Sequence, residues 1–213
     1  MEVQTPTIMS RLREETALHH ERAENKPLEQ ALVSGSLPRD MYVAMLQQRF
    51  LIHRTLEAQI RELRAADAAV ERIVQDELFQ EENIVADLTS FGADAEHVMP
   101  MRATKSLLDL ILTCAKQTPL ALLGIYYVFE GSKNGSRFIA RKIGPALGLT
   151  REHGMRYLDP HGENQRPLWM AFKQRMDAVG FADDAQDAMV EAAKRTFDAI
   201  GALDDEIFSA YPR

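Results

Sequence analysis

A histidine near the amino terminus is the first residue of the chain whose surroundings suggest chemistry. Thr16, His20 and Glu24 follow one another at four-residue spacing, so a helix would place them along one face. A neutral imidazole is a common metal ligand, and a carboxylate one turn away can orient it by a hydrogen bond. The adjacent His19 would point about 100° away, toward solvent. Spacing alone does not distinguish a ligand from the more common packed or surface histidine.

A second segment contains two glycines four residues apart, Gly131 and Gly135. Glycine inside a helix costs about 1 kcal/mol relative to alanine, so such a pair requires a local reason. Backbone without Cβ atoms can approach a flat ligand closely, whereas the ordinary explanation is a turn or a break between two helices. The segment is not a dinucleotide-binding fingerprint, because no strand precedes it.

A third segment, residues 169–177, carries Lys173 and Arg175 beside aromatic residues. These cations could hold a carboxylate-bearing ligand, but a solvated helix face is their ordinary explanation. None of the three segments identifies a function alone, and they gain meaning only when they are considered together.

The rest of the sequence predicts the helices that would position these segments, and it contains no convincing strand. Apolar residues recur at three- and four-residue steps across residues 38–63, the pattern of a long amphipathic helix. Residues 120–130 are apolar on nearly every side, so this helix belongs in the middle of the domain. Further helices are expected near residues 10–25, 27–34, 68–88, 100–116, 167–179 and 183–208. The prediction is a single all-α domain of roughly eight helices over residues 1–213, with residues 1–9 as a flexible N-terminal extension.

Composition restricts the class of protein. A chain of 213 residues with 46% hydrophobic and 27% charged residues can bury one core, which excludes a disordered protein. The net charge of -7 argues against broad binding of nucleic acid or anionic lipid. The single cysteine, Cys114, excludes an internal disulfide and a cysteine-cluster metal site, and it is expected to be buried. Because no signal peptide or membrane-spanning run is visible, we expect a cytoplasmic protein with no nucleic-acid or membrane partner.

Taken together, the segments resemble the heme oxygenase family. The stretch from Leu12 to Asn25 looks like the proximal helix of that family, with the axial histidine at His20. Further similarity lies in Glu130-Gly131-Ser132-x-x-Gly135 for the distal helix, in Tyr157-x-x-x-His161-Gly162 followed by Trp169-x-x-Phe172, and in Glu191-Ala192-Ala193-Lys194-x-x-Phe197 for the final helix. The Glu-Gly-Ser form resembles bacterial enzymes associated with bacteriophytochromes. The match extends to about Phe208 with the order and spacing of the family.

The resemblance implies a pocket for heme b between a proximal and a distal helix. The cofactor-binding positions that it implies are Arg13, Thr16, His20, Glu24, Tyr126, Lys173 and Phe197. Among these, His20 would bind the iron and Glu24 would orient its imidazole. Arg13, Tyr126 and Lys173 would lie near the heme propionates, and Phe197 would pack beside the macrocycle. The catalytic positions that it implies are Gly131, Ser132, Gly135 and Ser136.

The reaction that the resemblance implies is oxidation of heme, as both substrate and cofactor, to biliverdin with release of CO and iron. It would use O2 and electrons from an external donor, a ferredoxin or a flavoprotein reductase, and a phytochrome could accept the bilin. Ser132 stands where the best-known members carry an aspartate that organises water, and Ser136 stands where they carry a second glycine. The proton path is therefore unassigned, with Asn134, Arg137 and the Gly131 carbonyl as further candidates beside the two serines.

Two other classes of protein were considered. A non-catalytic protein of the same fold that senses, stores or carries heme would share His20, and Ser136 is the residue most compatible with it. A helical relative with a diiron centre or no metal is the third hypothesis. Diiron bundles use Glu-x-x-His pairs, and none of the six histidines has a glutamate three residues before it, which counts against that hypothesis.

Overall fold

Helices make up the regular secondary structure of the chain in the computed structural model, which describes residues 6–95 and 97–211. The α-helices in these residues are α1 (Ile8–Glu15), α2 (Ala17–Glu24), α3 (Pro27–Ser34), α4 (Arg39–Ala66), α5 (Ala68–Ile73), α6 (Glu81–Ser90), α7 (Arg102–Gln117), α8 (Leu122–Leu147), α9 (Gln165–Asp177) and α10 (Asp183–Ala210). Three short 3-10 helices are η1 (Asp76–Leu78), η2 (Pro119–Ala121) and η3 (Gly162–Asn164). The prediction of an all-α fold is confirmed.

Several helices are divided differently from the prediction. The helix expected near residues 10–25 is two helices, because Thr16 lies between α1 and α2 and its hydroxyl donates to the carbonyl four residues earlier at 2.6 Å. The segment 68–88 likewise forms α5, η1 and the larger part of α6. In contrast, α8 continues through Gly131 and Gly135. The ordinary explanation of those glycines, a break between helices, is therefore wrong.

The first helix begins earlier than the sequence predicted. Thr7 caps α1 by accepting a hydrogen bond from a backbone N–H of the first turn, and the side chains of Ile8 and Met9 are buried. The Met9 backbone N–H also donates to a carboxylate on α9 at 3.0 Å. A flexible extension reaching residue 9 is therefore wrong at its C-terminal end, and residues 1–5 lie outside the described part of the chain.

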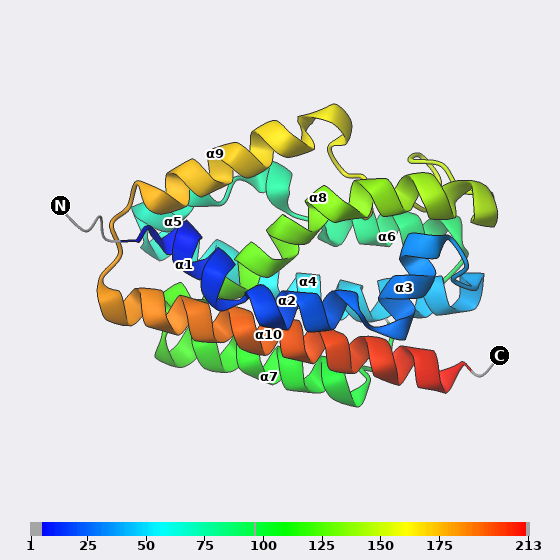
Figure 1. Ribbon diagram of the computed structural model, residues 1–213, viewed down its shortest axis with the longest axis horizontal. Coiled ribbons are helices and arrows are strands. Elements are labelled where there is room, and N and C mark those ends of the chain that lie inside the picture. The colour runs from blue at the N-terminus through cyan, green and yellow to red at the C-terminus, as the bar shows by residue number, and fades with distance from the viewer. Residues whose placement is uncertain (1–5, 96, 212–213) are drawn as a thin grey trace.

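The longest helices form the body of the molecule. α10 contacts α7, α8 and the helices α1 to α3, which follow one another along α10 (Figure 1). α8 and α10 cross at Gly124, where a Cβ atom would lie 1.9 Å from the backbone oxygen of Met189. Only glycine allows this close approach of the two backbones.

The helix α4 carries a buried polar stripe. Arg49, His53 and Glu57 recur at four-residue spacing on α4, and all three are buried. Two of them face Phe129 of α8, since the His53 ring packs on it edge to face at a centroid distance of 4.9 Å and the Arg49 guanidinium lies 5.8 Å from its centre. A buried polar stripe of this kind requires specific partners, because an unpaired buried charge is costly.

Two expectations from composition can be compared with the fold. Cys114 in α7 is buried and forms no disulfide, as predicted for a small apolar residue. Within the described residues, every helix is too short or too polar to span a bilayer.

Candidate functional site

A cavity of about 600 Å³ opens between α2 and α8. This volume is within the range of about 300–1,000 Å³ that is typical of small-molecule and cofactor sites. Apolar side chains form a large part of the lining: Ala17, Ala23, Leu32, Met45, Val128, Phe129, Ile139, Leu158, Phe197 and Ile200. The remaining lining residues supply the polar groups that could react with or orient a ligand.

His20 of α2 lines this cavity, together with Arg13, Thr16 and Glu24. Its side chain is 52% exposed, and its Nε2 atom lies 3.5 Å from Glu24 Oε1. The imidazole packs edge to face on Phe197 of α10, with ring centroids 5.3 Å apart. One ring nitrogen beside a carboxylate leaves the other nitrogen available as a ligand. We call this side of the cavity the α2 wall.

His19 is not the solvent-facing histidine that its position suggested. Its Nδ1 atom lies 2.8 Å from Asp198 Oδ1, and its side chain is 24% exposed, less than half the value for His20. The prediction failed because α10 runs alongside that face of α2 and supplies the carboxylate. The more exposed histidine is the one that faces the cavity.

The opposite helix, α8, presents glycine to the cavity. A Cβ atom added to Gly135 would meet nothing within 4 Å, although Gly135 is a lining residue. At Gly131 the added atom would lie 3.5 Å from the Trp169 ring, an ordinary contact distance. Packing within the protein therefore does not require glycine at position 135, whereas a side chain there would occupy the cavity. This α8 wall has the shape that a flat ligand needs.

The hydroxyl and amide groups of the α8 wall turn back onto their own helix. Ser132 Oγ donates to the Phe129 carbonyl at 2.8 Å, and Ser136 Oγ donates to the Ser132 carbonyl at 3.0 Å. Asn134 Nδ2 donates to the Gly131 carbonyl at 3.0 Å. The two serines, which both line the cavity, therefore offer it oxygen lone pairs rather than protons.

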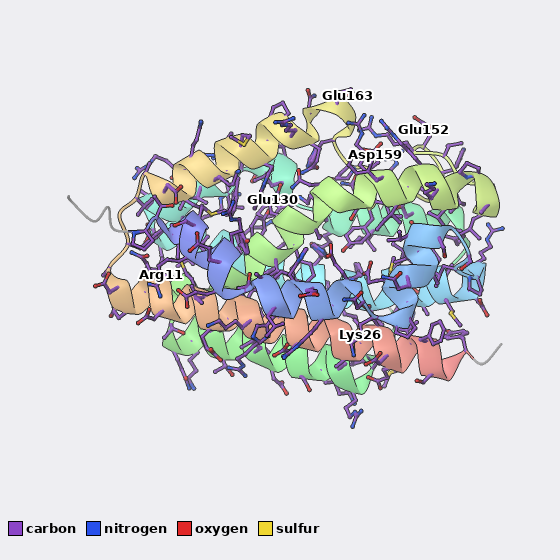
Figure 2. The ribbon with its side chains drawn as sticks, in the orientation of Figure 1. Arg11, Lys26, Glu130, Glu152, Asp159 and Glu163 are labelled. Atoms are coloured by element: carbon purple, nitrogen blue, oxygen red, sulfur yellow. The ribbon has the colours of Figure 1, made fainter. Side chains whose placement is uncertain are left out.

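Arg137, also a candidate for the proton path, points elsewhere. Its guanidinium group donates to Glu163, and its Nε atom lies 3.8 Å from Asp159 Oδ1. Both acidic residues belong to the segment that leads into α9 (Figure 2). Arg137 therefore fixes this segment to α8 and is not a lining residue of the cavity.

Two cations lie at the edge of the cavity, one in its lining and one beside a lining residue. Arg13 of α1 is a lining residue, and its side chain is 80% exposed. Lys173 of α9 is not a lining residue. Its Nζ atom lies 5.6 Å from the centre of the ring of Trp169, which does line the cavity. A carboxylate at this edge would therefore meet Arg13 directly, and Lys173 beside Trp169.

Tyr126, which the family resemblance placed at the same edge, lies elsewhere. Its side chain is buried, and its ring packs with Phe79 and Phe172 at centroid distances of 6.5 and 6.1 Å. Tyr127 lines the cavity instead. Adjacent helical residues point about 100° apart, so a shift of one position moves the side chain from one face of α8 to another.

Two lining residues that the sequence analysis did not single out, Tyr127 and Arg49, could have been found from four-residue spacing. Counting back from Gly135 in steps of four leads to Gly131 and then to Tyr127, so these three residues share a face. The same step from Met45 leads to Arg49, which also lines the cavity. Arg49, a charged residue within the apolar stripe of α4, was therefore the sequence signal for the charged part of the cavity lining.

That part of the cavity holds a buried cluster of charged groups. Arg49 of α4 and Glu29 of α3 both line it. Arg49 Nη2 lies 3.6 Å from Oδ1 of Asp204, a fully buried residue of α10. Burial raises the pKa of Asp204 to about 7, while Arg49 opposes the shift. Burial likewise raises the pKa of Glu29, so both carboxyl groups hold a proton more readily than an exposed acid does.

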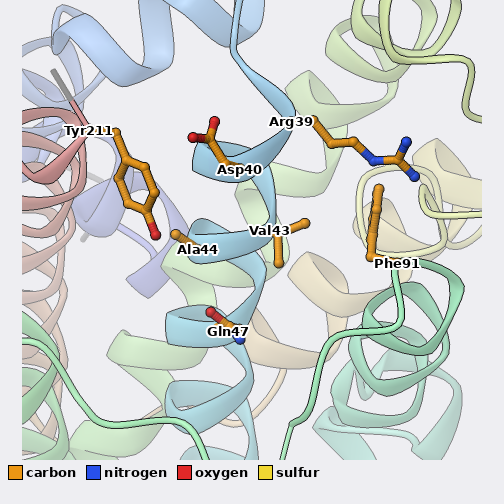
Figure 3. Close-up of a pocket in the computed structure, with 7 residues that line it drawn as sticks. All are labelled: Arg39, Asp40, Val43, Ala44, Gln47, Phe91 and Tyr211. Atoms are coloured by element: carbon orange, nitrogen blue, oxygen red, sulfur yellow. The ribbon is translucent and has the colours of Figure 1, made fainter. Parts of the chain in front are cut away.

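A second hollow, of about 560 Å³, lies at the start of α4. Its lining consists of Arg39, Asp40, Val43, Ala44, Gln47, Phe91 and Tyr211 (Figure 3). Arg39 lies over the Phe91 ring at 4.9 Å, and the Asp40 carboxylate accepts a hydrogen bond from the next backbone N–H. This lining lacks a histidine or a glycine wall, so we assign the chemistry to the cavity between α2 and α8.

The described residues contain no group of three histidine, cysteine, aspartate or glutamate side chains placed to share a metal ion. A diiron centre requires such a group. The arrangement around His20 is instead that of a single protein ligand, with an apolar cavity beside it.

Comparison with known proteins agrees with this geometry. The family model for heme oxygenase matches residues 7–203. Heme oxygenase 2 of Rattus norvegicus is 22% identical over 192 residues, which are 88% of this chain and 61% of that protein. The chain thus spans about three fifths of the length of the curated relatives that it matches.

Solved structures show the same fold. The heme oxygenase of Leptospira interrogans superimposes with a TM-score of 0.86 at 20% identity, covering 94% of this chain and 100% of that one. Heme oxygenase-1 of Synechocystis, solved in complex with heme, gives a TM-score of 0.87 at 18% identity and covers 96% of this chain and 94% of that one. Because the family model covers nearly the whole chain, this protein belongs to the heme oxygenase family.

Proposed function

We propose that the protein is a heme oxygenase, which binds heme b in the cavity between α2 and α8 and converts it to biliverdin, CO and iron. The observation that carries this proposal is that His20 and the backbone of Gly135 face one cavity from two helices. When bound, heme would supply the redox centre and would itself be the group oxidised by O2.

The α2 wall would bind and orient the ligand. His20 would coordinate the iron through one ring nitrogen, while Glu24, 3.5 Å from the imidazole, would hold the ring by the other. Phe197 limits rotation of the imidazole by its edge-to-face contact. Arg13 and Lys173 would neutralise carboxylates at the exposed edge.

The α8 wall would leave room for O2 and water. The side-chain oxygens of Ser132 and Ser136 can accept hydrogen bonds from water there, since their own protons are donated to carbonyls of α8. Protons would then reach the cavity through water and not directly from these hydroxyls. Electrons would come from a ferredoxin or a flavoprotein reductase, and a phytochrome is the bilin acceptor that we propose.

Hemin titration of the purified protein tests the proposal. We expect a saturable Soret band that converts to biliverdin absorption when ascorbate, or ferredoxin with its reductase, is added under air. His20→Ala should weaken hemin binding and abolish conversion. His19→Ala is the matched control, because His19 bonds to Asp198 outside the cavity, and it should behave like the wild type.

Three results would contradict the proposal. A stable Soret band that no reductant converts would instead indicate a protein that senses, stores or carries heme. If hemin gives no saturable band, or if His20→Ala behaves like the wild type, His20 is not the iron ligand.

A further inference from the structure

The polar stripe of α4 includes two residues that the proposed function does not use, His53 and Glu57. Both are buried and hydrogen-bonded to each other, with His53 Nδ1 3.2 Å from Glu57 Oε1. The other ring nitrogen, His53 Nε2, lies 3.4 Å from the hydroxyl of Tyr157. Tyr157 lines the cavity, so the three side chains form a continuous series from the core to the cavity.

The direction of these hydrogen bonds follows from Glu57. Its Oε1 atom accepts the backbone N–H groups of Gln80 at 2.6 Å and Glu81 at 3.2 Å. Its Oε2 atom lies 3.5 Å from Nη2 of Arg61. These partners are all donors, so Glu57 acts as a carboxylate that only accepts. The proton between Glu57 and His53 therefore belongs to His53 Nδ1.

His53 is neutral, which leaves its second nitrogen without a proton. Burial lowers the pKa of His53; Lys133 and Arg49 act in the same direction, and Glu57 opposes them. With the proton on Nδ1, Nε2 can only accept a hydrogen bond. Tyr157, a lining residue of the cavity, must therefore donate its hydroxyl proton to His53, and its oxygen keeps only lone pairs for any further partner.

The backbone of Tyr157 is fixed by a separate buried carboxylate. Asp87 of α6 is fully buried, and it accepts the backbone N–H groups of Arg156 at 2.9 Å and Tyr157 at 2.8 Å. This anchor holds the segment before α9 against the core. The hydroxyl of Tyr157 is thus positioned from both ends, by its backbone and by His53.

We propose that Glu57 and His53 hold Tyr157 as a hydrogen-bond acceptor in the cavity wall, where it orients water with a proton toward Tyr157 and leaves no acidic hydroxyl pointing at the ligand. Tyr157 is a positioning residue in this proposal, which rests on the proposed function for its chemical purpose. Ser132 and Ser136 have the same polarity, because their protons are donated to α8 carbonyls.

Other charged groups face this series and must be separated from it in any test. Arg49, Glu29 and Asp204 act on Tyr157 in addition to Glu57, and Lys133 acts on His53. Asp204 titrates near pH 7, so each measurement should be made at pH 6 and pH 8. The inferred tautomer of His53 should be the same at both values.

Long-range proton–nitrogen NMR of the full, hemin-free protein with labelled histidine reads the tautomer directly. We expect His53 to show a protonated Nδ1 and a bare Nε2, with His53→Gln identifying its signals. Tyr157→Phe should shift the Nε2 resonance by removing its donor. Tyr126→Phe is the matched control, because Tyr126 faces away from the cavity, and it should leave that resonance in place.

The wild-type spectrum decides the matter even if Tyr157→Phe does not fold. A proton on Nε2, or a doubly protonated ring at both pH values, would overturn the proposal, and so would an unshifted Nε2 resonance in folded Tyr157→Phe. No hemin is used, so this test can fail while hemin conversion succeeds, and the reverse also holds.

A second readout uses the hemin-loaded protein and the pH midpoint of its visible absorption change. An acceptor favours the more protonated form of nearby water, so Tyr157→Phe should lower the midpoint by about half a pH unit or more. A donor would have the opposite effect. A midpoint that rises or stays constant would therefore contradict the acceptor role.

Discussion

The two walls of the cavity are built in opposite ways. On α2, the proposed iron ligand is one histidine whose carboxylate neighbour is largely exposed, and its partners lie within one helical turn or on α10. On α8, the cavity surface is backbone and small side chains, but the helix behind it is fixed by buried ions. We therefore expect the α2 wall to tolerate replacement of its histidine without loss of fold, whereas the shape of the α8 wall depends on the integrity of the core.

The buried ions behind α8 show how strong this dependence is. Lys133 Nζ donates to Glu130 Oε2 at 2.5 Å and to the Leu78 carbonyl at 2.7 Å. Both charged side chains are at most 5% exposed, and Glu130 is labelled beside the ribbon of its own helix, α8, near the middle of the view (Figure 2). The pair sits one residue before and two residues after Gly131, so it fixes the α8 wall from its rear face.

Lys133→Met should give the largest effect on stability. Removing the ammonium group leaves Glu130 as an unpaired buried charge, which typically costs about 3–5 kcal/mol. Urea unfolding measures this loss, and the double change with Glu130→Leu should recover much of it. His20→Ala on the α2 wall should change the free energy of unfolding by less than about 0.5 kcal/mol. Similar losses from both single changes would remove the contrast between the walls.

Asp204→Asn should reveal the charged cluster at the inner end of the cavity through the pH dependence of stability. The folded-state pKa of Asp204, about 7, is above its usual range. A raised acid pKa contributes stability that is present at low pH and is lost as the pH rises through 7. Asparagine does not titrate, so the variant lacks this pH-dependent loss of stability. The free energy of unfolding of the variant minus that of wild type should therefore increase by about 1 kcal/mol or more between pH 5 and pH 8.

The matched control is the neighbouring Asp205, whose side chain is half-exposed and pairs with Lys26. Asp205→Asn should change the pH dependence much less than Asp204→Asn, because burial is the main cause of the raised Asp204 pKa and the Asp205 charge only adds to it. If the Asp204→Asn difference is constant or falls with pH, the carboxylate is not held in the state that burial implies. Urea unfolding at both pH values supplies the measurement.

Gly135→Ala should give the smallest change in stability. It should stabilise the hemin-free protein but weaken hemin binding. The position is helical with open space around it, so alanine should stabilise the hemin-free protein by about 0.5–1 kcal/mol. The added methyl group would enter the cavity and should weaken hemin binding. Thermal unfolding and hemin titration measure the two effects, and a variant that binds hemin as well as the wild type would show that this face does not meet the ligand.

The sequence predicted the parts of the structure that depend on local pattern. The apolar periodicity of α4 and the continuous hydrophobicity of the first half of α8 predicted both helices, and the four-residue spacing from Thr16 to Glu24 predicted a shared face. The break at Thr16 was missed, because a side-chain hydrogen bond to the preceding turn competes with the helix without changing the apolar pattern.

Long-range partners could not be inferred in this way. Arg49 and Asp204 are 155 residues apart in the chain (204 minus 49) yet 3.6 Å apart in space, and no local pattern predicts such a pair. The placement of Tyr126 failed for a related reason. A family motif fixes the register only approximately, whereas one position along a helix changes which face a side chain occupies.

Gly124 has a mechanical consequence for the cavity. The backbone contact with Met189 fixes α8 against α10 at that point, while Gly135 lies eleven residues further along the same helix (135 minus 124), or about 16 Å at 1.5 Å per residue. The point at which α8 is held against α10 therefore lies outside the cavity lining. A rotation of about 6° at the crossing would move the α8 wall by more than about 1.5 Å over that length. The width of the cavity is therefore sensitive to packing at Gly124, a position outside the cavity lining.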